Sequence, residues 1–114
     1  MITADFLYNS KSGELICDIT GHAGGEKGKD LVCAGASMLA MTLAQNIEDL
    51  AASDVQFPES PTAVTQDGLC HIRVKASEEQ YNAIRLIFNT VATGFYLLAY
   101  NFPDRVVFHT KDEK

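Results

Sequence analysis

Two side chains in the first third of the sequence, His22 and Cys33, have the residue types of a general base and a nucleophile. A cysteine thiolate attacks a carbonyl carbon, and a nearby histidine takes the thiol proton and later gives it to the leaving amine. The segment between them, residues 23–29, contains three glycines, whose wide choice of backbone dihedral angles lets the chain fold back. The pair therefore predicts acyl transfer, and the spacing leaves open whether the two side chains meet.

The position of Cys33 adds to its chemistry, because we expect a helix to begin near Leu31. A helix start presents unpaired N–H groups with about half a positive charge, which favours a thiolate and can stabilise an oxyanion. Asp30 is a good N-cap; it either only caps the helix or also orients His22 or binds the substrate. Ser37 follows Cys33 by one helical turn, and it either bonds a backbone carbonyl or lines the site.

The other cysteines and histidines favour structural roles. Cys17 and Cys70 lie within predicted strands on the apolar side, and His71 and His109 have no helpful neighbours in sequence. The spacing contains no Cys-x-x-Cys or His-x-x-x-His pair, which disfavours zinc, and no resolving cysteine near Cys33, which disfavours a thiol redox protein. No Walker loop, dinucleotide fingerprint or serine elbow is present. We therefore expect neither a metal nor a cofactor.

The composition is that of a compact folded protein. Its 114 residues, 46% of them hydrophobic, fit a single domain over residues 1–114. The net charge of −6 disfavours nucleic acid binding; it either attracts a basic peptide or only keeps the protein soluble. Three cysteines at irregular spacing indicate a reducing compartment. No apolar run reaches the roughly 20 residues of a membrane span, and the first residues lack signal-peptide features, so we expect a soluble cytoplasmic protein.

Hydrophobic periodicity predicts the elements that would position this site. Alternating apolar residues indicate strands, and apolar residues at steps of three and four indicate two amphipathic helices. Ser77 opens the second helix with a capping box, and Pro103 stops it. The order ββαββαβ favours an α+β two-layer sandwich with both helices on a mainly antiparallel sheet. The predicted strands cover about residues 2–8, 14–21, 62–66, 69–75 and 105–110, and the predicted helices about 31–52 and 78–101.

The motif as a whole resembles the signature of the ribosomal-processing cysteine protease family Prp, also described as YsxB-like. It reads Gly21-His22-Ala23, then Gly28-Lys29-Asp30-Leu31-Val32-Cys33-Ala34, then Ser37. The resemblance extends over the whole chain in length and element order. It implies His22 and Cys33 as the catalytic dyad, with Asp30, Ser37, Gly21 and Ala34 as supporting or substrate-binding positions. Gly35 departs from the family pattern, which often has alanine there, and this difference puts only helix packing in doubt.

The same resemblance implies a substrate and a partner. The family removes a short N-terminal extension from a large-subunit ribosomal protein, the twenty-seventh in the bacterial naming, after hydrophobic and aromatic residues. Its members form homodimers. We further expect the glycine loop to close on the bound peptide. The alternative from a different class is a non-catalytic ribosome-associated binding module, against which the His22–Cys33 pair at a helix start is the main sequence feature.

Overall fold

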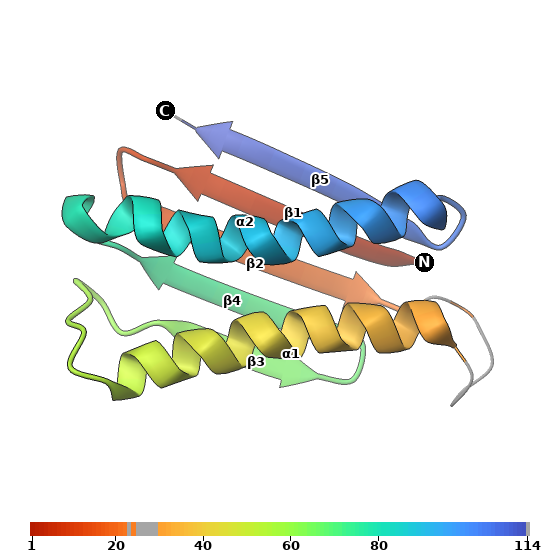
Figure 1. Ribbon diagram of the computed structural model, residues 1–114, viewed down its shortest axis with the longest axis horizontal. Coiled ribbons are helices and arrows are strands. Elements are labelled where there is room, and N and C mark those ends of the chain that lie inside the picture. Colours follow the sequence, from red (N-terminus) through yellow and green to blue (C-terminus); the bar gives the residue numbers. More distant parts are fainter. Residues whose placement is uncertain (23, 25–29, 114) are drawn as a thin grey trace.

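The computed structural model describes residues 1–22, 24 and 30–113, and its elements follow the predicted order. Figure 1 shows two long helices lying on one face of a single sheet. The predicted α+β sandwich is therefore confirmed, and the last strand extends three residues beyond its predicted end at 110. The elements are β1 (Ile2–Asn9), β2 (Glu14–Gly21), α1 (Leu31–Ala52), β3 (Thr62–Gln66), β4 (Leu69–Lys75), α2 (Glu78–Asn101) and β5 (Val106–Glu113).

The sheet has the strand order β3-β4-β2-β1-β5 and is mainly antiparallel, as predicted. Among the described strands, β1 and β5 are the one pair that is parallel. Each helix connects two strands that run in the same direction, α1 from β2 to β3 and α2 from β4 to β5, and such connections need a crossover. Because both crossovers lie on one face, the described residues place no helix on the other face of the sheet (Figure 1).

The core lies between the helices and the sheet. Ile2, Ala4, Phe6 and Tyr8 alternate with more exposed residues along β1 and point toward the helices. Phe88 and Phe95 of α2 are fully buried. The apolar sides of the two helices also include partly buried residues that pack against this core, among them Leu39, Leu50 and Leu98. The buried helix residues are Val32, Ala36, Ala40, Leu43, Ala44 and Ile47 of α1 and Tyr81, Ile84, Phe88, Val91, Ala92 and Phe95 of α2.

The two helices approach each other at a glycine of α2 rather than of α1. A Cβ atom on Gly94 would lie 2.5 Å from Leu39 Cδ2, so a larger residue there would force Leu39 to move. A Cβ atom on Gly35 would lie at an ordinary 3.6 Å from Leu98 Cδ2. The close approach of the helices therefore occurs at Gly94, and alanine, which the family often has at position 35, fits the space there.

The outer side of α2 is unusually apolar. By length and composition alone this helix could cross a membrane. The expectation that no apolar run is long enough for a membrane span is therefore too strict. Its inner side is packed on the sheet, and a capping box at Ser77 fixes its start. Leu86 and Tyr100 on the helix remain exposed, at 67% and 72%. Thus α2 is a core helix whose other side presents hydrophobic groups at the surface.

Candidate active site

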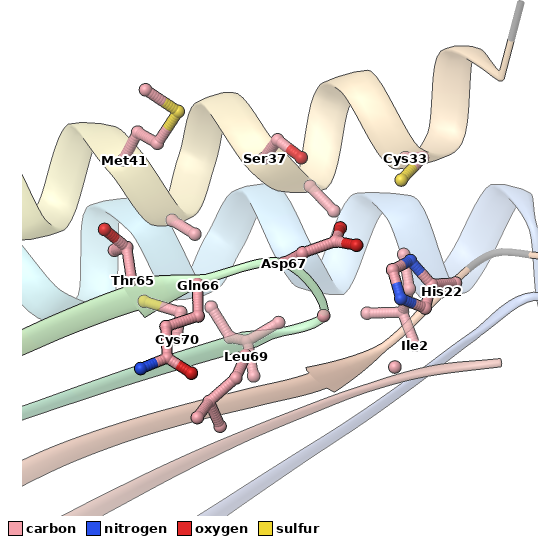
Figure 2. A pocket seen from close by; sticks show the side chains of 15 residues that line it. Ile2, His22, Cys33, Ser37, Met41, Thr65, Gln66, Asp67, Leu69 and Cys70 are labelled. Carbon is pink, nitrogen blue, oxygen red and sulfur yellow. The ribbon is translucent and has the colours of Figure 1, made fainter. Parts of the chain in front are cut away.

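A cavity of about 400 Å³ lies between the N-terminal half of α1 and the β3–β4 hairpin. Gly21, His22, Cys33 and Ser37 line it, so four of the six predicted site residues come together in space. Ala34 is exposed and is not part of the lining. Figure 2 shows His22 and Cys33 at the same end of the cavity, one from the end of β2 and the other from the start of α1.

Cys33 belongs to the first turn of α1 and is partly buried against the core. In Figure 2 its sulfur points away from the helix, toward the side of the cavity where the imidazole of His22 lies. Ser37 follows one turn later and also faces the cavity. The alternative role, a hydrogen bond to a backbone carbonyl of the helix, is seen at Thr42, whose hydroxyl donates to the carbonyl of Met38 at 2.6 Å. Of the two roles considered for Ser37, the structure therefore favours lining the site.

The backbone around His22 is held by the β3–β4 turn and by the N-terminus of the chain. The amide of Gly21 donates to the carbonyl of Gly68 at 2.9 Å, and the N-terminal amine of Met1 donates to the carbonyl of His22. Gly21 has φ +96°, and a Cβ atom there would lie 2.1 Å from the carbonyl oxygen of Met1. Glycine is therefore required at position 21 by the backbone path, which delivers His22 to the mouth of the cavity.

Asp30 caps α1, which confirms the local interpretation of this residue. Its Oδ1 atom accepts from the amides of Val32 and Cys33 at 3.0 and 3.1 Å, and Arg105 Nη1 lies 3.4 Å away. The side chain of Asp30 is only 7% exposed. Its carboxylate is thus committed to the helix start and to Arg105, on the α1 side of the site.

This cap changes the expected source of oxyanion donors. The amides of Val32 and Cys33 are bonded to the Asp30 side chain, and that of Ala34 is bonded to the Asp30 carbonyl at 3.0 Å. Among the described residues, the amide of Leu31 is then the first-turn donor that remains. The sequence predicts several unpaired N–H groups at the helix start. In the described residues one of them remains available, that of Leu31.

Replacing Asp30 with alanine is expected to lower the free energy of unfolding by about 1 kcal/mol, the usual effect of losing an N-cap. Asparagine caps helices equally well, so Asp30→Asn should retain most of the stability while losing the charge that faces Arg105. Urea denaturation of both variants measures the difference. Equal losses in the two variants would show that the ion pair with Arg105, rather than the cap, dominates the contribution of Asp30.

The β3–β4 hairpin is the part of the site that sequence reasoning missed. Asp67-Gly68 is a strong tight-turn pair by residue type, but nothing in the sequence places this turn against residue 22. A Cβ atom on Gly68, where φ is +73°, would lie 2.7 Å from Nε2 of His22. Ile2, Ile19 and Leu69 add apolar surface to the cavity, and Thr65 and Gln66 add polar groups from β3.

The other two thiols differ from Cys33 in their burial. Cys17 is 0% exposed and Cys70 4%, as expected for mid-strand residues. Burial raises the pKa of the Cys70 thiol to about 11, and the charge of Asp18 adds to this effect. Burial also raises the pKa of Cys17 well above its usual range. Both thiols are therefore protonated at neutral pH, although Cys70 reaches the cavity.

The remaining histidines have partners on neighbouring strands. His71 bonds Asp18, and His109 Nδ1 lies 3.0 Å from Asp5 Oδ1. These pairs lie on the face of the sheet opposite the helices, because the residues that alternate with them are buried beneath α1 and α2. Within the part of the chain that the structure describes, no group of three or more His, Cys, Asp or Glu side chains could hold a metal ion.

The chain is similar to known proteins over nearly its whole length. A family model described as cysteine protease Prp matches residues 1–107. The crystal structure of SMU.848 from Streptococcus mutans is 30% identical, with a TM-score of 0.67, over 99% of this chain and 96% of that one. The ribosomal processing protease Prp from S. aureus, crystallised with a covalently linked product peptide, is 25% identical, with a TM-score of 0.71, over 97% of this chain and 100% of that one. Among curated protein sequences, none matches significantly.

Proposed function

The chain belongs to the cysteine protease Prp family, and from this premise we propose that it removes the N-terminal extension of a large-subunit ribosomal protein, number twenty-seven in the bacterial naming. The single observation that supports this most strongly is that His22 and Cys33, from two different elements, line one end of one cavity. We assign Cys33 as the nucleophile and His22 as its base. The S. aureus relative is described as a ribosomal processing protease and was crystallised with a peptide product.

The proposed reaction passes through a thioester. Cys33 gives its proton to His22, and the sulfur attacks the carbonyl carbon of the scissile peptide bond. The tetrahedral intermediate collapses when His22 protonates the leaving amine, and a water activated by His22 then hydrolyses the thioester and releases Cys33. Leu31 begins α1, and we propose its amide as a donor to the oxyanion. Ser37 lines the cavity beside the nucleophile, and we propose that it contacts the substrate backbone.

The cavity suits a substrate that is cut after hydrophobic or aromatic residues. Ile2, Ile19 and Leu69 are apolar residues of the cavity lining, and burial of an aromatic side chain there would contribute roughly 2 kcal/mol of binding free energy. The net charge of −6 would attract a basic ribosomal protein over long range. Closure of the glycine loop, residues 23–29, falls on residues that lie outside the described ones except for Gly24, and it stays a prediction.

The test is to incubate the purified protein with the ribosomal protein that carries its extension. Mass spectrometry should find a single cut, directly after a hydrophobic or aromatic residue, and no cut when charged residues replace that segment. A non-catalytic binding module would retain the extended protein on a column and release it intact. Binding without any cleavage would therefore reject the protease and favour the alternative.

We also propose that the protein acts in the cytoplasm as a homodimer, with the outer side of α2 in the interface. Leu86, Tyr96, Leu97 and Tyr100 on this helix are between 51% and 72% exposed, which is unusual for large hydrophobic side chains on one helix. A second copy would cover them. Sedimentation equilibrium should give twice the chain mass, and Leu97→Glu should shift it to the chain mass. A wild-type protein that sediments as a single chain would contradict the dimer.

A further inference from the structure

The turn between β3 and β4 lies close to the imidazole of His22 (Figure 2). A Cβ atom on Gly68 would lie 2.7 Å from Nε2, 3.3 Å from Cε1 and 3.5 Å from Cδ2 of that ring. The Nε2 corner of the imidazole is therefore the part closest to the turn. The hydrogen bond from the Gly21 amide to the Gly68 carbonyl, at 2.9 Å, ties the same turn to the residue before His22.

Asp67 precedes Gly68 in this turn, and its side chain lines the same cavity as His22 and Cys33. Figure 2 shows the carboxylate of Asp67 extending from the turn toward the imidazole of His22, in the space beneath Cys33. In the described part of the chain this carboxylate is in none of the hydrogen bonds or ion pairs, whereas that of Asp30 is bound to the helix start and Arg105. Asp67 is thus the carboxylate of the cavity that is available to the imidazole.

Building on the proposed function, we propose that Asp67 is a positioning residue that orients His22 and stabilises its charged form during catalysis. When the S–H bond of Cys33 breaks and an N–H bond forms on His22, the ring becomes a cation. A carboxylate already directed at the ring lowers the energy of that cation without taking its proton. The site then has a third polar member, supplied by a hairpin far from His22 and Cys33 in sequence.

The turn itself does not need a carboxylate at this position. The left-handed conformation belongs to Gly68, and none of the described non-glycine residues, Asp67 among them, has a positive φ. Asparagine favours turns as aspartate does and has nearly the same shape. The substitution Asp67→Asn therefore removes the charge and leaves the hairpin intact, which makes it a clean test of the electrostatic role.

The experiment compares steady-state cleavage by wild type, Asp67→Asn and Asp54→Asn. Asp54 is exposed beyond the end of α1, so its variant makes the same charge change away from the cavity. Asp67→Asn should lower kcat about tenfold and keep KM within roughly twofold of the wild-type value. An effect of this size is expected when one partly screened charge beside the ring is lost. At about 1 M salt the difference from wild type should narrow, because the Debye length falls to about 3 Å. Asp67→Glu should recover part of the rate.

The ¹⁵N chemical shifts of the His22 ring provide a readout without substrate. They should change in Asp67→Asn and stay at the wild-type values in Asp54→Asn. An unchanged kcat, a rise in KM alone, or ring shifts equal to wild type would overturn the role of Asp67. The protease proposal would survive any of these results as long as the wild type cleaves. Absence of cleavage by the wild type would instead reject the protease, and the ring shifts would still decide whether Asp67 contacts His22.

Discussion

Replacing Cys33 with alanine is expected to reduce kcat/KM for the extended ribosomal protein by at least about a thousandfold. The loss is this large because, among the described residues that line the cavity, the one other thiol is that of Cys70, and burial raises its pKa to about 11. Cys33 is only partly buried, so the free energy of unfolding should change by about 1 kcal/mol or less. Cleavage rates and urea denaturation of the same preparation give the two quantities.

The control for this prediction is Cys17→Ala, which removes a thiol from the core and not from the cavity. It should lose stability through the small void that it leaves, yet the folded protein should cleave at the wild-type rate. A second control is the order of alkylation at neutral pH, where Cys33 should react before Cys17 and Cys70. If Cys33→Ala processed the substrate as fast as wild type, the thioester mechanism would be wrong whatever the family relationship.

The elements of this fold were predictable because their signals are local. Asp30 before Leu31 is an N-cap in sequence and in structure, and Ser77 opens a capping box in both. Alternating apolar residues predict the strands β1 and β2, and the antiparallel register of the two shows that they form a hairpin. Within such segments the nearest partners lie a few residues away, so residue type and spacing are enough.

The site was predictable only in part because its geometry is not local. His22 and Cys33 were identified by their chemistry and by the resemblance to a family, while their shared cavity depends on how α1 crosses the sheet. The β3–β4 turn reaches His22 because β4 pairs with β2, a register that no single segment encodes. The same holds for His71, whose partner Asp18 is directly opposite on β2 and 53 residues away in sequence. Strand pairing therefore determines the neighbours that sequence reasoning could not supply.

Gly68→Ala is expected to lower kcat/KM by about a hundredfold, the second-largest effect. The new Cβ atom would stand 2.7 Å from Nε2 of His22, closer than real Cβ contacts allow, and the imidazole is the part that can move. Displacement of a catalytic group by about 1 Å is enough for a loss of this size. The backbone also contributes, since φ is +73° at Gly68 and alanine there should lower the free energy of unfolding by about 1 to 2 kcal/mol.

Two further variants separate the moved imidazole from the strained backbone. Gly13→Ala places a Cβ atom 2.2 Å from the carbonyl oxygen of Ala76 at φ +80°, at the turn between β1 and β2 and away from the cavity. It should lose at least as much stability, while the fraction that remains folded cleaves normally.

Gly68→Asn tolerates the left-handed backbone better than alanine but brings the same Cβ atom to the ring. It should therefore regain stability without regaining activity. Recovery of both together would mean that Gly68 serves only the turn, and that the position of the His22 ring is set by other contacts.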